Sequence, residues 1–183
     1  MAGTSCDMKE IKKLSNKYGF LIIEDASHAI GAKYLDEPVG NCKYSDITIF
    51  SFHPVKIITT IEGGMALTNN EEIAKKIEIL RGHGITRNPD NFEFESPGPW
   101  YYEQQELGFN YRFNEIQAAI GMSQLDKLDG FILKRRKLME NYRIALEDFP
   151  NINFLLEPEY AYSSYHLAIL SLLKTKKENH LNL

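Results

Sequence analysis

Two groups capable of acid–base chemistry follow two apolar segments of this chain. Asp25 comes directly after the run Phe-Leu-Ile-Ile-Glu at 20–24, and Lys56 follows closely after the run at 46–51. Short runs rich in Ile, Leu and Phe are typical of buried strands. Ligands of open α/β sheets bind beyond the carboxyl ends of the strands, so Asp25 and Lys56 are candidates for one site at one edge of a sheet.

A carboxylate and an amine in this arrangement are what pyridoxal phosphate chemistry requires. The amine of Lys56 would hold the cofactor aldehyde as a Schiff base, and the carboxylate of Asp25 would keep the pyridine nitrogen protonated. Each signal alone is weak, because an Asp after a strand commonly caps a turn and a loop lysine is commonly a solvated charge. The hypothesis depends on three motifs in order, which are Asp-Ala-Ser-His at 25–28, Ser-Phe-His-Pro-Val-Lys at 51–56 and Thr-Thr-Ile-Glu-Gly-Gly at 59–64.

The hydrophobic pattern predicts the elements that would position these residues. Apolar residues recur at helical spacing over 7–18, and Gly19 is placed to end that helix. The run 20–24 follows as a strand, and a helix followed by a buried strand is half of a crossover unit of a parallel sheet. We expect this strand to be covered on both faces. The other elements expected in this half are an edge strand at 31–34, a turn at 37–41, strands at 46–51 and 65–68, and a helix at 71–80 opened by Asn69 or Asn70.

The second half begins with an irregular stretch at 88–109 that is rich in proline and aromatic residues. A loop of this length inside a compact domain is typically functional or interfacial. Two helices are expected at 115–128 and 131–149, broken near Asp129 and Gly130. We interpret the second helix as a connector, so that 1–149 is a partial cofactor-binding large domain and 150–183 begins a small, incomplete C-terminal domain.

Composition excludes several other classes of protein. The chain has 183 residues, 43% hydrophobic and 25% charged, as in ordinary soluble globular proteins. Its net charge is −4 with scattered basic residues, which predicts no nucleic-acid partner. No apolar run approaches the ~20 residues that span a bilayer, so no membrane partner is expected. Cys6 and Cys42 predict reduced thiols in a cytoplasmic protein, and the five histidines lack metal-binding spacing, so no metal site is expected.

Three blocks of the sequence resemble the DegT/DnrJ/StrS family of sugar aminotransferases. These blocks are 24–31, 51–64 and the run Gly-Phe-Asn-Tyr-Arg-Phe-Asn-Glu-Ile-Gln-Ala-Ala that starts at Gly108. The resemblance implies an α/β fold of the aspartate aminotransferase type, with a central sheet covered by helices and the start of a small α+β domain. His-Pro-Val-Lys followed by Ile-Thr-Thr is most similar to the branch that makes pseudaminic acid precursors. That branch aminates C4 of a UDP-linked 4-keto-6-deoxy-N-acetylhexosamine, with glutamate as amino donor.

The resemblance also implies a role for each matching residue. Lys56 would be the Schiff-base lysine and would shuttle the proton, and Asp25 would pair with the pyridinium nitrogen. His28 would lie near the phenolic oxygen of pyridoxal phosphate, and Ser51 would donate to its phosphate. Asn110 would reach the phosphate of the neighbouring subunit's cofactor, which implies a homodimer with shared active sites.

The resemblance further implies that parts of the family's site lie outside this sequence. These are an amino-terminal Gly-rich helix start that binds phosphate, an aromatic residue that stacks on the ring, and most of the small domain. We therefore expect residues 1–183 alone to bind pyridoxal phosphate weakly or not at all and to show no transamination. Two alternatives remain, an inactive fragment or regulatory remnant of such an enzyme and a sugar dehydratase of the same fold. The dehydratases carry His at the lysine position, so Lys56 argues against the second alternative.

Overall fold

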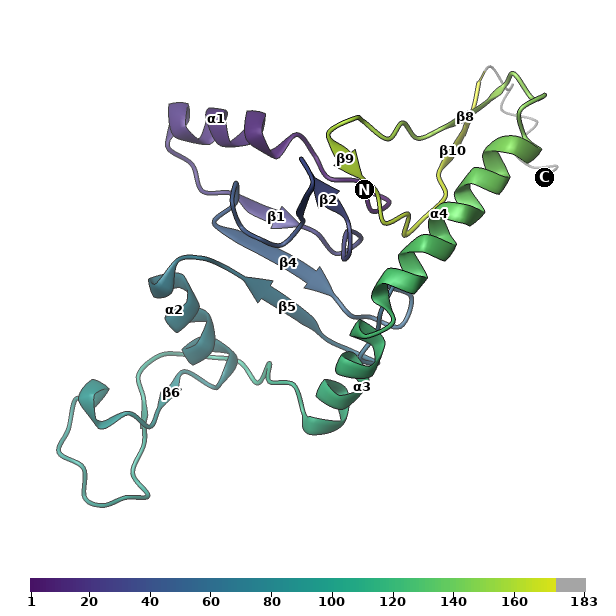
Figure 1. The fold of residues 1–183 in the computed structure, drawn as a ribbon. Coiled ribbons are helices and arrows are strands. Elements are labelled where there is room, and N and C mark those ends of the chain that lie inside the picture. Colours follow the sequence, from purple (N-terminus) through teal and green to yellow (C-terminus); the bar gives the residue numbers. More distant parts are fainter. Residues whose placement is uncertain (174–183) are drawn as a thin grey trace.

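The computed structural model describes residues 1–173, and its centre is a three-stranded sheet (Figure 1). The sheet has the order β1-β4-β5 and consists of Ile23–Asp25, Ile47–Ser51 and Gly64–Leu67. Strands β1 and β4 are parallel, whereas β5 is antiparallel to β4. Because the carboxyl ends of parallel strands meet at one edge of a sheet, the chain after β1 lies beside the chain after β4.

Two helices are bounded by local capping signals. Helix α1, Met8–Tyr18, begins after Asp7, whose carboxylate accepts from the backbone N–H of Glu10, and it ends at Gly19 with φ of 75°. Helix α2, Glu71–Arg81, begins after Asn70, whose side chain accepts from two backbone N–H groups of the first turn. The helices predicted at 7–18 and 71–80 are confirmed.

The break between the last two helices lies earlier than predicted. Helix α3 is Glu115–Leu125 and helix α4 is Leu128–Ala145, so Gly130 lies inside α4 and the predicted break at this glycine is wrong. A glycine is tolerated inside a helix, and here partly buried Leu128 packs against the core near the start of α4. The helix also ends before the predicted boundary at 149. None of the helices within residues 1–173 is long and apolar enough to cross a membrane.

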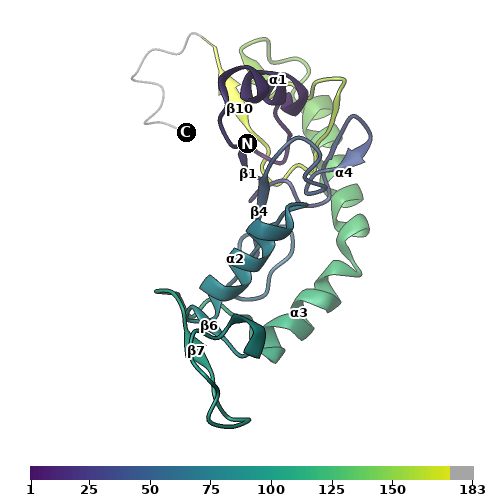
Figure 2. The same ribbon diagram turned by 90° about the vertical axis from the view of Figure 1, so that its left-hand side faces the viewer.

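Three small sheets complete the described part of the chain. Strands β3 (Glu37–Pro38), β2 (Lys33–Tyr34) and β9 (Ala161–Tyr162) form one sheet, and β8 (Ile152–Phe154) pairs with β10 (Leu170–Leu172). Strand β6 (Ile85–Thr86) pairs with β7 (Glu103–Gln104), and with the short helix Pro89–Asn91 they form an extension that projects from the body (Figure 2). The pairing of β9 with β2 ties the segment after α4 to the first third of the chain.

The main core lies between the sheet and helix α4. Its buried residues are all apolar, and they are Ala26, Ala29, Ala32, Phe50, Phe52, Ile57, Ile58 and Ile132. Gly31 has φ of +75°, and a Cβ there would lie only 3.0 Å from the side chain of Ile132. The turn after β1 is therefore fixed closely against α4.

The other face of the sheet is open within the described residues. Thr48 and Phe50 are buried, but Ile49 between them is 38% exposed and Ile23 is 63% exposed. Successive residues of a strand point to opposite faces, which explains the alternation. The prediction that 20–24 is a strand covered on both faces is therefore wrong for residues 1–173. Asp25 pairs with Ile49 and lies on this open face.

Candidate active site

Lys56 lies in a compact turn just beyond strand β4. Its backbone N–H donates to the carbonyl of His53 at 2.9 Å, and the next two residues are buried in the core at 6% and 3% exposure. The hydroxyl of Thr59 also donates to the carbonyl of Phe52 at 2.9 Å, which closes the loop on itself. The half-buried Lys56 is thus held at the edge of the sheet by its own loop.

Asp25, the last residue of β1, has its carboxylate oriented by Ser27. Its Oδ1 accepts from the backbone N–H of Ser27 at 3.0 Å and from the Ser27 hydroxyl at 2.5 Å. These bonds hold the pKa of the Asp25 carboxyl below its ordinary value, and the charges of His28 and Lys56 act in the same direction. Asp25 is therefore ionised at neutral pH, and within residues 1–173 its Oδ2 makes no hydrogen bond.

His28 joins these two residues at the carboxyl edge of the parallel strands. Burial lowers the pKa of His28, the positive charge of Lys56 lowers it further, and Asp25 partly opposes both effects. Asp25 ends β1, His28 follows it in the next turn, and Lys56 lies in the turn beyond β4, which pairs in parallel with β1. The strand topology therefore places Asp25, His28 and Lys56 at the same edge of the sheet.

Ser51, the last residue of β4, lies at the same edge of the sheet. Its Oγ accepts from the backbone N–H of His53 at 3.4 Å, which links the strand end to the turn that holds Lys56. Across the sheet Ser51 is opposite Gly64. Its predicted contact with a phosphate stays a prediction.

Asn110 lies in the segment between β7 and α3. It is exposed and lines an open groove of about 910 Å³ over β4, β5 and α2, together with Gly63 and Gly64. Its Oδ1 accepts from the guanidinium of Arg112 at 3.5 Å. In the part of the chain that the structure describes, no hydrogen bond joins Asn110 to the other candidate residues, and its role toward a neighbouring subunit stays a prediction.

His166 belongs to this site and was not among the predicted residues. Its ring centroid lies 4.4 Å from that of His28, with 47° between the ring planes. Its side chain is buried, and its Nδ1 has no hydrogen-bond partner within residues 1–173. Burial lowers the pKa of His166 to about 4, and the charges of His28 and Lys56 contribute. The only sequence signal was the polar string at 163–166, whose first two serines are fully buried.

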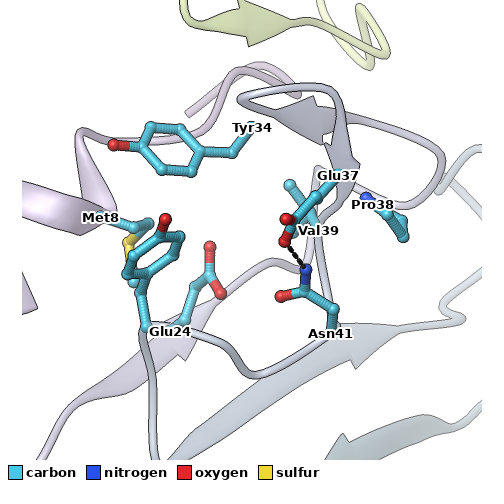
Figure 3. A pocket seen from close by; sticks show the side chains of 8 residues that line it. Met8, Glu24, Tyr34, Glu37, Pro38, Val39 and Asn41 are labelled. Atoms are coloured by element: carbon cyan, nitrogen blue, oxygen red, sulfur yellow. Dashed lines mark hydrogen bonds between the residues drawn. The ribbon is translucent and has the colours of Figure 1, made fainter.

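A separate small cavity lies between α1, β1 and the β2–β3 hairpin (Figure 3). Glu24 points into it, and the Glu24 Oε2 accepts from the hydroxyl of Thr48 at 3.0 Å. Burial raises the pKa of the Glu24 carboxyl. The cavity measures about 10 Å³, enough for roughly one water molecule, so it is not a substrate site.

Comparison with known proteins decides the family. The whole chain, residues 1–183, matches the DegT/DnrJ/EryC1/StrS aminotransferase family. The chain belongs to this family. The resemblance found in three sequence blocks is thereby confirmed, and with it the α/β aminotransferase fold.

Individual relatives agree with this assignment. UDP-4-amino-4,6-dideoxy-N-acetyl-beta-L-altrosamine transaminase of Campylobacter jejuni is 43% identical over 166 residues, which are 91% of this chain and 41% of that protein. Helicobacter pylori PseC, an aminotransferase involved in the biosynthesis of pseudoaminic acid, superposes with a TM-score of 0.83 at 33% identity, covering 93% of this chain and 43% of PseC. The PMP form of Spr1654 from Streptococcus pneumoniae gives a TM-score of 0.80 at 27% identity, covering 94% and 47%. The chain thus spans less than half the length of each relative.

Proposed function

We propose that this chain is part of a pyridoxal-phosphate-dependent aminotransferase that acts on a nucleotide-linked sugar. The reaction would transfer the amino group of glutamate to C4 of a 4-keto-6-deoxy sugar, a precursor of a surface polysaccharide or a flagellin glycan. The observation that supports this most is the position of Asp25 and Lys56 beyond the carboxyl ends of the parallel neighbours β1 and β4, in a chain of this aminotransferase family. The similarity to the Campylobacter transaminase supports the choice of sugar.

The side chains at this edge fit pyridoxal phosphate. A carboxylate with one oxygen that makes no hydrogen bond within residues 1–173 suits a protonated ring nitrogen. A primary amine suits an aldehyde, and a strand-end hydroxyl suits a phosphate. When bound, pyridoxal phosphate supplies an electron sink for the breaking of a bond at the α-carbon of the amino donor.

Each residue then has a distinct task. Asp25 would bind the ring nitrogen and keep its proton in place, and Ser51 would orient the phosphate. His28 would bind near the phenolic oxygen. Nζ of Lys56 would take the proton from the α-carbon of the amino donor, and the compact turn holds the Lys56 backbone at the edge of the sheet.

A homodimer with shared sites is part of this proposal. Asn110 is exposed and lines an open groove. An exposed amide in that position can serve the site of a second copy. In the proposal it binds the cofactor phosphate of the neighbouring subunit.

Chemical labelling tests the site directly. The chain is combined with the unmatched portion of a full-length relative, supplied as a separate polypeptide, and incubated with pyridoxal phosphate. The sample is reduced with borohydride and digested, and the pyridoxyl label is located by mass spectrometry. We expect the label on Lys56, its loss in Lys56→Arg, and its retention in the matched control Lys33→Arg. A label on another lysine in the wild-type chain would contradict the assignment.

The reaction is tested with a UDP-linked 4-keto-6-deoxy-N-acetylhexosamine and glutamate. The chain is assayed alone and together with the unmatched portion of a full-length relative, supplied as a separate polypeptide. We expect amination only in the combined sample. Combined samples that bind the cofactor at Lys56 but aminate no keto sugar would refute the proposed substrate.

A further inference from the structure

The segment 163–166, which follows strand β9, crosses the turn that holds His28. The hydroxyl of Ser164 donates to the backbone carbonyl of His28 at 3.1 Å. Two residues further on, the ring of His166 packs on the ring of His28, with 4.4 Å between the centroids. The segment thus contacts His28 at both its backbone and its side chain.

Helix α4 holds this segment in place through two neighbouring arginines. Arg136 donates to the carbonyl of Ser163 at 2.8 Å and to the carboxylate of Glu157 at 2.7 Å. Glu157 in turn accepts from the backbone N–H of Ser163 at 2.6 Å. Arg135 donates to the carbonyl of His166 at 3.1 Å. Charge-assisted bonds to the backbone fix the segment independently of the histidine ring.

The amino-terminal residues hold the segment from another side. The backbone N–H of Ser164 donates to the carbonyl of Gly3 at 3.0 Å. A Cβ on Gly3, which has φ of +101°, would lie 2.5 Å from the Ser164 hydroxyl oxygen. The close approach therefore requires glycine, and it fixes the position from which His166 reaches His28.

We propose that His166 is a positioning residue for His28, whose ring it packs against and shields from water. The segment 163–166 thereby takes part in the site although it is remote from the sheet in sequence. The proposal rests on the proposed function only in taking His28 as a cofactor-site residue. The packing of one ring on the other can be tested without cofactor.

The charges around the two rings make this shielding measurable. His28 faces His166, Lys56, Asp25 and the amino terminus, and His166 also faces Arg135. Burial is the largest cause of the lowered pKa of His28. Removal of the His166 ring admits water to His28, so the pKa of His28 should rise toward its ordinary value of 6.5.

The test is an NMR titration of the imidazole C2 protons in residues 1–183. We expect His166→Ala to raise the pKa of His28, and the conservative variant His166→Phe, which refills the space, to keep it low. Arg135→Met is the matched control, and it should keep the pKa of His28 low. It removes one anchor of the segment but leaves the His166 ring, and Arg136 still holds the segment. His166→Leu, which fills part of the space, should give an intermediate pKa and replaces the alanine variant if that variant unfolds.

Two outcomes would overturn the proposal. One is a pKa of His28 that stays the same in the alanine and leucine variants, and the other is a rise in His166→Phe as large as in His166→Ala. The second readout is the dissociation constant for pyridoxal phosphate, measured by fluorescence on the chain combined with the unmatched portion of a full-length relative. We expect it to increase several-fold in His166→Ala and to stay near the wild-type value in His166→Phe. Failure of borohydride labelling at Lys56 with the expected NMR result would refute the proposed function and leave the ring contact standing.

Discussion

The buried imidazole of His166 should make the folded chain sensitive to acid. Its pKa is lowered from 6.5 to about 4 in the folded state, mainly by burial. As pH falls below 6.5, the unfolded chain binds a proton at this position and the folded chain does not. The unfolded state therefore binds more protons in the window between pH 6.5 and about 4, and the free energy of unfolding decreases as pH decreases through it.

The size of the effect follows from the two pKa values. At about pH 5 the proton-binding polynomial of His166 in the unfolded state is roughly 30 times that in the folded state. This ratio corresponds to about 2 kcal/mol of free energy of unfolding. At about pH 7.5 the same ratio is close to 1, so nearly the whole difference appears between these two conditions. A loss of about 2 kcal/mol is large for a fold of ordinary stability, which is roughly 5–15 kcal/mol.

Urea unfolding at these two pH values, followed by circular dichroism, measures the loss. His166→Phe should lose about 2 kcal/mol less than the wild-type chain on acidification, because it has no imidazole to protonate at this position. Glu24, whose pKa is raised by burial, acts in the opposite direction but is present in both proteins and cancels in the comparison. His53→Gln, which changes an exposed histidine, should keep the full loss. Equal losses in the wild-type chain and in His166→Phe would refute the reasoning.

Three further predictions concern the site, a helix cap and the open face. In the complete, cofactor-loaded protein, Asp25→Asn should reduce glutamate-dependent amination by about two orders of magnitude and leave folding unchanged. The reason is the loss of a few kcal/mol of charge stabilisation. Near-normal turnover would mean that Asp25 is only a structural cap. Asn114→Ala removes the capping box at the start of α3 and should lower stability by about 1 kcal/mol in urea unfolding without changing the labelling of Lys56. Ile23→Thr combined with Ile49→Thr should reduce any self-association of residues 1–183, measured by sedimentation velocity. Both side chains lie on the open face of the sheet, where apolar groups favour association. Unchanged association would mean that another surface is responsible.

The elements with strong local signals were predictable from the sequence. Asp7 and Gly19 mark the ends of α1, and Asn70 marks the start of α2, because capping residues act within one turn of the helix that they bound. The sequence also predicted that Asp25 and Lys56 follow two strands of one sheet, and β1 and β4 pair in parallel. These predictions needed only local chemistry and one rule of sheet topology.

Burial and long-range contacts were not predictable in the same way. The run at 20–24 is apolar enough for a strand covered on both faces, but a sequence pattern does not tell which neighbouring layers the described residues supply, and Ile23 is exposed. Gly130 signalled a helix break, yet α4 begins at Leu128, which packs against the core, and continues through the glycine. His166 was missed because its partner His28 is remote in sequence, and no periodicity links two residues at such a distance.

The hydroxyl of Ser164 has a consequence for the order of folding. It donates to the carbonyls of His28 and Gly3 across separations of 136 and 161 residues. Closing long loops costs more chain entropy than forming local turns, so contacts between distant segments form late. During synthesis, a nascent chain that has emerged only as far as α4 already contains Asp25 and Lys56, but the support for His28 has not yet been made. The support for His28 at this edge of the sheet is therefore complete only when the segment 163–166 has been synthesised.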